Sequence, residues 1–171
     1  MNYCSDCGQP TVIEIPEGDS FPRSVCSACR TIHYRNPLVV VGCVPEWEGK
    51  LLLCKRAIEP RLGYWTAPAG FLELGETLEE GAARETREEA CAKVEIGSML
   101  AVASVRHTNQ VHIMYRARLL DGKFSAGAES QEVRLFGPNE IPWEDLAFRS
   151  ITFSLKKWLA DPQGGVHCTS F

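Results

Sequence analysis

Three glutamates near the middle of the chain have the spacing of a cation site. Glu85, Glu88 and Glu89 lie at positions i, i+3 and i+4, so on a helix they would share one face. Like charges at this spacing destabilise a helix by about 0.2–0.5 kcal/mol per pair when no counterion is present. Clustered carboxylate oxygens are the ligands that Mg²⁺ and Mn²⁺ prefer. The pattern therefore indicates a divalent-metal site, and the alternative is the solvated face of a charge-rich helix.

The cysteines form a second metal-binding pattern. Cys4 and Cys7 make one C-x2-C pair, and Cys26 and Cys29 make another after eighteen intervening residues, a spacing typical of four-cysteine zinc sites. Because cysteine would fill all four tetrahedral positions, no position is left for water, and a structural Zn²⁺ is predicted. Two disulfides or four free thiols are the alternatives. His33, which follows the second pair, is interpreted as a packing or hydrogen-bonding residue.

The composition is that of an ordinary globular protein. The 171 residues are 44% hydrophobic and 23% charged, with a formal net charge of -4, which argues against a general affinity for nucleic acid or anionic membranes. No apolar run has the length of a membrane span, and residues 1–6 lack the basic start and apolar core of a signal peptide. We therefore expect a cytoplasmic protein. Disulfides rarely persist in that compartment, which favours zinc at the four cysteines.

The elements that must position these residues alternate along the chain. Thr77 followed three residues later by Glu80 is a capping box, which predicts a helix over Leu78–Ala90. The apolar spacing of residues 150–160 predicts a closing amphipathic helix. Strands are expected over residues 38–44, 51–56, 93–96, 99–106 and 110–119, and residues 129–136 are expected to run from a loop into another strand.

Interleaved strands and helices favour an α/β sandwich with helices on both faces of a mixed sheet. Cys43 and Cys54 are expected to be core thiols. Residues through His167 and Cys168 are expected to form a loose tail with no metal. Pro37 divides the chain into a small module, residues 1–36, and a main domain, residues 37–171.

The glutamates belong to a longer string with a defined spacing. Five residues separate Gly70 from Glu76, seven separate Glu76 from Arg84, and two separate Glu85 from Glu88. This segment resembles the Nudix box, the signature of the Nudix hydrolase family. The resemblance covers roughly residues 37–160. It implies the Nudix α/β/α sandwich and a metal-dependent hydrolase that cleaves a pyrophosphate joining a nucleoside to another group.

Three positions of the box depart from the family pattern. Thr86 stands where an aliphatic residue is usual, Ala92 where a larger aliphatic residue is usual, and Cys91 where glycine is usual. Glycine adopts the left-handed conformation of a helix end at little cost, and cysteine does not. The departures therefore concern packing and helix termination, not metal binding.

The resemblance also implies roles for individual residues. It makes Glu85, Glu88 and Glu89 ligands of Mg²⁺ or Mn²⁺, with the carbonyl oxygen of Ala69 as a further ligand. Arg84 would orient the glutamates through ion pairs, and the alternative for it is an exposed helix pair.

The general base is left open by the sequence. Family members use either a box glutamate or one from a later loop, so Glu129 and Glu132 are both candidates, and geometry must decide between them. Because many members are homodimers, the resemblance also makes a homodimer an expectation.

The wider pattern points to a substrate class. A four-cysteine ribbon ahead of the box, together with segments at residues 15–19, 32–37 and 61–70, resembles the branch associated with ADP-ribose and FAD hydrolysis, and also the zinc-ribbon NADH pyrophosphatases. The expected reaction is ADP-ribose to AMP and ribose 5-phosphate, with FAD or NADH as the alternative substrate. A different class is a ribbon that binds nucleic acid, in a regulator or an RNA cap-removing protein. The mixed charges of the ribbon argue against that class.

Overall fold

The computed structural model describes residues 1–162 and 164–171, and they form two compact units, Met1–Asn36 and Pro37–Phe171. The first unit contains a three-stranded antiparallel sheet in the order β1-β2-β3, with strands Thr11–Glu14, Arg23–Cys26 and Ile32–His33. Among the described residues, none of the helices has the length and apolar character needed to cross a bilayer.

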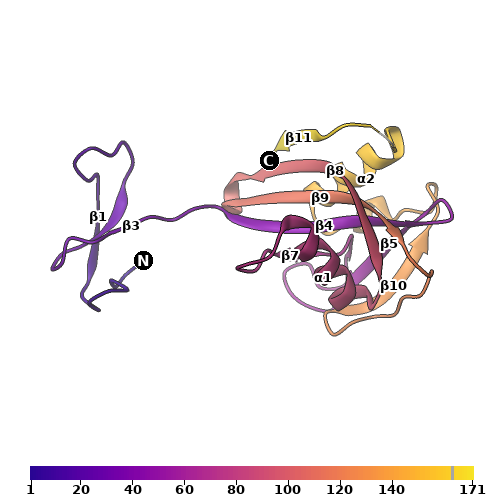
Figure 1. Ribbon diagram of the computed structural model, residues 1–171, viewed down its shortest axis with the longest axis horizontal. Coiled ribbons are helices and arrows are strands. Elements are labelled where there is room, and N and C mark those ends of the chain that lie inside the picture. The colour runs from indigo at the N-terminus through magenta and orange to yellow at the C-terminus, as the bar shows by residue number, and fades with distance from the viewer. Residues whose placement is uncertain (163) are drawn as a thin grey trace. The chain divides into compact units, whose positions relative to one another are not determined.

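The second unit is built on one mixed sheet of eight strands (Figure 1). Its main path runs in the order β10-β5-β4-β9-β8-β11, while β6 pairs with β5 and β7 pairs with β4. The pairs β4–β9 and β8–β11 are parallel, and the other pairs are antiparallel. The strands are β4 Leu38–Trp47, β5 Lys50–Arg56, β6 Trp65–Thr66, β7 Ala69–Phe71, β8 Val94–Val105, β9 Gln110–Leu119, β10 Ser130–Phe136 and β11 His167–Ser170.

Two helices cover opposite faces of this sheet. Helix α1, Leu78–Ala90, packs in a cluster with Cys43 and Tyr115, whereas helix α2, Arg149–Ala160, packs in a cluster with Val44 and Met114. Because successive residues of a strand point to opposite faces, the two clusters lie on the two sides of the sheet. The predicted α/β sandwich with a mixed sheet is therefore confirmed. Two short 3-10 helices, Arg106–Thr108 and Trp143–Asp145, complete the unit.

Helix α1 begins and ends where the sequence predicts. The Glu80 backbone N–H donates to the Thr77 hydroxyl at 3.2 Å, and the Glu80 carboxylate accepts from the Thr77 N–H at 2.8 Å, so the capping box is formed. Cys91 ends the helix in the left-handed conformation, with a φ of 47°. The helix therefore stops as it would at glycine, but with a side chain where that conformation disfavours one.

The side chains of Thr86, Cys43 and Cys54 lie buried in the core. Thr86 is fully buried, and its hydroxyl donates to the Ala82 carbonyl at 2.8 Å and lies 3.1 Å from the Cys43 sulfur. Cys43 and Cys54 are both core thiols, as expected. Burial raises the pKa of the Cys43 thiol to about 12, so it stays protonated.

Two expectations about strands are wrong. Residues 93–96 and 99–106 were expected to be separate strands, but β8 runs through both regions, with register shifts between Ile96 and Met99 and between Met99 and Ala101. The expected loose tail contains β11, which pairs in parallel with residues 101–104 of β8. An irregular strand and a partner strand far away in the sequence both lack a local periodic signal.

Candidate active site

A cavity of about 1070 Å³ in the second unit contains most of the charged residues singled out above. Its carboxylates come from α1, from the loop after β5, from the loop before α1 and from the loop before β10: Glu59, Glu73, Glu85, Glu88, Glu89 and Glu129. Its basic side chains are Arg56, Arg61, Arg84, Arg149, His107 and His112. The cavity thus combines groups suited to cations with groups suited to anions.

Two of the helix glutamates are almost fully buried. Glu85 and Glu89 are 9% and 6% exposed, whereas the Glu88 side chain is 59% exposed. Desolvation, with a further contribution from the charge of Glu85, raises the pKa of Glu89 to about 8. Desolvation also raises the pKa of Glu85, against the opposing effect of Arg84. A cation close to these carboxylates would favour their ionised forms.

The backbone of β7 lies directly beside these two carboxyl groups. The Ala69 N–H donates to Glu89 Oε2 at 3.3 Å. A Cβ atom added at Gly70 would overlap the Glu85 carboxyl group. Glycine is therefore required here by the close approach of strand and carboxylate, not by an unusual backbone conformation.

Arg84 connects the box loop to the helix. Its guanidinium donates to Glu76 at 2.6 Å, to Glu85 at 2.6 Å, to Glu88 at 3.1 Å and to the carbonyl of Phe71 at 2.9 Å. Glu76 and Glu85 raise the pKa of Arg84, and Arg84 in turn lowers the pKa of Glu76. Arg84 thus touches two of the three glutamates that it was expected to orient.

The glutamates of α1 do not converge as tightly as the cysteines of the first unit. The donor atoms of the four cysteines all lie within 4.8 Å of one another. Within residues 1–162 and 164–171, no group of three carboxylates meets the same condition. Arg84 binds one oxygen of Glu85 and one of Glu88, which holds both side chains toward itself. The donor set of two buried carboxyl groups and a third nearby still fits a hard divalent cation.

The structure separates the two candidate bases. Glu129 lines the cavity, and its charge contributes to the raised pKa values of Glu85 and Glu89. Glu132 is exposed on β10, where it pairs with Lys55 of β5, and it does not line this cavity. The register of β10 shifts between Ser130 and Glu132, so the two glutamates lie on either side of an irregularity.

The loop that carries Glu129 is attached to the end of α1. The Ser125 N–H donates to the Ala90 carbonyl at 2.9 Å, and the Gly127 N–H donates to the Glu89 carbonyl at 3.0 Å. These bonds satisfy two of the carbonyl groups that a helix leaves unpaired at its C-terminus. The same bonds fix the loop next to a glutamate of the cavity.

Arg56 is a cavity residue that the sequence analysis missed. It ends β5, is 9% exposed, and donates through Nε to the Pro60 carbonyl at 2.8 Å. Its guanidinium carbon lies 5.1 Å from the centre of the Phe148 ring, and its charge acts on Glu89. The available signal was a cationic residue at the end of an apolar strand.

The cysteines of the first unit have the geometry of a tetrahedral site. The sulfur of Cys4 lies 3.7 Å from that of Cys29, and the sulfur of Cys7 lies 3.5 Å from those of Cys26 and Cys29. A disulfide needs about 2.05 Å, whereas Zn–S bonds of about 2.3 Å place sulfurs roughly 3.8 Å apart. His33 Nε2 lies 3.3 Å from the Cys4 sulfur, a position that supports a ligand instead of adding one. The four thiols fit Zn²⁺.

Comparisons with known proteins agree with this arrangement. A family profile described as the NUDIX domain matches residues 36–159, and a second, described as the Nudix N-terminal zinc ribbon, matches residues 2–35. The chain belongs to the Nudix hydrolase family. The first profile covers strands β4 to β10, helix α1, nearly all of helix α2 and the cavity residues up to Ser150.

Individual Nudix relatives extend the comparison. An ADP-ribose pyrophosphatase of Methanocaldococcus jannaschii is 33% identical over 113 residues, which are 64% of this chain and 67% of that protein. An NAD-capped RNA hydrolase NudC of Vibrio parahaemolyticus is 35% identical over 89 residues, which are 52% of this chain but 32% of that protein. The match therefore spans about a third of the length of that hydrolase.

A solved structure resembles the whole chain. The crystal structure of a NUDIX hydrolase from Nitrosomonas europaea has a TM-score of 0.96 and 55% identity, and the match covers 100% of this chain and 99% of that one. The likeness includes both the ribbon and the Nudix domain.

Proposed function

We propose that this Nudix hydrolase uses Mg²⁺ or Mn²⁺ to cleave the pyrophosphate bond of ADP-ribose, giving AMP and ribose 5-phosphate. The observation that carries the proposal is one cavity lined by the α1 carboxylates, by Glu129 and by the buried Arg56. Divalent cations on these carboxylates would offset their negative charge where the diphosphate binds. The similarity to an ADP-ribose pyrophosphatase supports the choice of substrate.

Each residue then has a chemical task. Glu85, Glu88 and Glu89 would hold the divalent cations, with the carbonyl of Ala69 as a further ligand. When bound, such cations neutralise the diphosphate and lower the pKa of the attacking water. Arg84 keeps Glu85 and Glu88 in place through its hydrogen bonds.

The remaining tasks fall to Glu129 and Arg56. Glu129 would accept a proton from the attacking water, and its exposed position among the residues that line the cavity supports this role. Arg56 offers a fixed guanidinium to a phosphate oxygen. Glu132 remains the alternative base.

FAD and NADH are the alternative substrates because both contain the same ADP half. The match to an NAD-capped RNA hydrolase adds a capped RNA to the set that must be tested. In the same proposal the four cysteines bind a structural Zn²⁺, the protein is cytoplasmic, and it works as a homodimer.

The test is hydrolysis of ADP-ribose, FAD, NADH and NAD-capped RNA by the full chain, with and without added Mg²⁺ or Mn²⁺. Wild type is compared with Glu89→Gln, Glu129→Gln and Glu132→Gln. We expect cation-dependent release of AMP, a loss of activity in Glu89→Gln, and a fall in kcat of about 10²–10⁴-fold in Glu129→Gln. Absence of diphosphate cleavage under every condition would refute the proposal. A loss confined to Glu132→Gln would assign the base to that residue.

A further inference from the structure

One wall of the active-site cavity carries cationic, aromatic and amide side chains in place of carboxylates. It is formed by the β8–β9 turn, the start of α2 and the end of β11, and its side chains are His107, Gln110, His112, Phe148, Arg149 and Phe171. This wall offers stacking and hydrogen-bonding groups but no carboxylate side chain to bind a cation. It therefore suits a part of the substrate other than the diphosphate.

Arg149 and Phe171 form a stacked pair in this wall. The guanidinium carbon of Arg149 lies 4.6 Å from the centre of the Phe171 ring. That ring also packs edge to face with Phe153, with centroids 6.4 Å apart and an interplanar angle of 79°. Phe171 is half-buried and Arg149 is exposed. The Phe171 ring therefore contacts Phe153 as well as the guanidinium that lies over it.

Backbone hydrogen bonds fix Phe171 to the β8–β9 turn. Its N–H donates to the Ser104 carbonyl at 3.0 Å, and its own carbonyl oxygen accepts from the Arg106 N–H at 3.1 Å. This pairing continues the parallel register of β11 on β8. These bonds attach the Phe171 half of the pair to the edge of the sheet.

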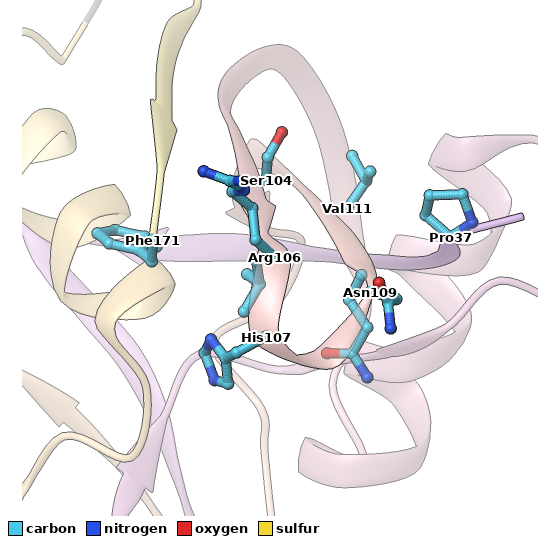
Figure 2. A pocket seen from close by; sticks show the side chains of 9 residues that line it. Pro37, Ser104, Arg106, His107, Asn109, Val111 and Phe171 are labelled. Carbon is cyan, nitrogen blue, oxygen red and sulfur yellow. The ribbon is translucent and has the colours of Figure 1, made fainter. Parts of the chain in front are cut away.

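A second cavity, of about 680 Å³, adjoins the same wall (Figure 2). The two cavities share Val105, His107, Gln110 and Phe171. In Figure 2, Phe171 and Pro37 lie on opposite sides of the β8–β9 turn, which carries Arg106 and Asn109 between them. No acidic side chain lines this second cavity among the residues that the structure describes. The active-site cavity therefore continues into a neutral to basic groove.

The position of Arg149 has no explanation within helix α2. Arg149 is the first residue of the helix, where the helix dipole is positive and a cation is unfavourable. The first turn contains no acidic residue, and no side chain caps the helix. Residues that break a local rule in this way are typical of functional positions.

We propose that the Arg149–Phe171 pair binds the nucleobase of the substrate. The base stacks on the open face of the Arg149 guanidinium, which Phe171 backs, and the diphosphate extends from there toward the glutamates. Aromatic rings and planar guanidinium groups are the usual stacking partners of bases in proteins. This inference rests on the proposed function, because it assumes a substrate that contains a nucleoside diphosphate.

The test separates the two halves of ADP-ribose. Dissociation constants of AMP and of ribose 5-phosphate are measured by NMR titration of the full chain, without added divalent cation, into the millimolar range. The variants are Arg149→Ala, Arg149→Lys and Phe171→Ala. Phe21→Ala is the matched control, because Phe21 also stacks with an arginine, Arg23 at 5.7 Å, but lies in the first unit.

We expect wild type to bind AMP more tightly than ribose 5-phosphate. Arg149→Ala and Phe171→Ala should weaken AMP binding about tenfold and leave ribose 5-phosphate unchanged. Arg149→Lys should behave like Arg149→Ala, because lysine keeps the charge but has no planar group. Phe21→Ala should match wild type.

Three results would overturn the inference. The first is equal binding of AMP and ribose 5-phosphate by wild type, and the second is unchanged AMP binding in the Arg149 variants. The third is wild-type AMP binding in Arg149→Lys, because a lysine that replaces the arginine fully would indicate a phosphate site. The proposed function is tested separately by hydrolysis. If wild type cleaves no diphosphate while AMP binding depends on Arg149, the base site stands and the proposed reaction falls.

Discussion

Gly127 provides a direct test of how Glu129 is positioned. A Cβ atom at this residue would lie 2.8 Å from the carbonyl carbon of Glu88, and closer still to its oxygen, whereas ordinary contact begins at 3.4 Å. The obstacle is the backbone of α1, which cannot turn aside as a flexible side chain can. Gly127→Ala must therefore push the loop away from the helix.

The size of the effect follows from what the loop would lose. Displacement breaks the hydrogen bonds from Ser125 and Gly127 to the last carbonyls of α1. At about 0.5–1.5 kcal/mol each, their loss lowers the free energy of unfolding by about 1–3 kcal/mol. Glu129 lies two residues further on, and a misplacement of about 1 Å can reduce a rate about 10²-fold. We expect that reduction in kcat, with a smaller change in KM.

The assay is steady-state hydrolysis of the best diphosphate substrate, together with denaturant unfolding of the same samples. Gly165→Ala is the matched control, because a Cβ there meets nothing within 4 Å, and it should change neither quantity. The reasoning is refuted if Gly127→Ala keeps the wild-type kcat while Glu129→Gln loses activity. Unchanged unfolding in Gly127→Ala would show that the loop does not press on the helix.

Three further predictions concern the metal, the pH dependence of stability and the helix end. Wild type should contain about one zinc per chain by elemental analysis, and Cys26→Ala should lower that value; equal zinc in both would exclude these ligands. Burial lowers the pKa of His112, so the folded protein disfavours the charged ring. The free energy of unfolding of wild type should therefore fall relative to that of His112→Gln as the pH drops below about 6.5. If urea titrations give the same difference between the two proteins at every pH, this prediction is wrong. Cys91 has a left-handed φ of 47°, so Cys91→Gly should stabilise the protein by a few tenths to about 1 kcal/mol. A melting temperature of Cys91→Gly below that of wild type would contradict this.

The helix of the box and the metal patterns were readable from short stretches of sequence. The bounds of α1 follow from Thr77, Glu80 and the helix formers after them, because a capping box is a contact between residues three apart. The four-cysteine set follows from two tight pairs, and the sulfurs do cluster. The mixed α/β architecture follows from alternating periodicities. Each of these signals depends on neighbours along the chain.

The rest was decided by contacts between distant segments. Glu129 and Glu132 are equivalent in sequence, and only the attachment of the loop to α1 and the irregular start of β10 place Glu129 in the cavity. The last strand is ordered by its pairing with β8, 66 residues earlier in the chain (His167 pairs with Ala101), so no local pattern predicts it. That pairing brings Phe171 onto Arg149. The sequence by itself therefore determined the family and the acidic helix, whereas the tertiary structure decided which later residues line the cavity. Those contacts exist only after the sheet has formed.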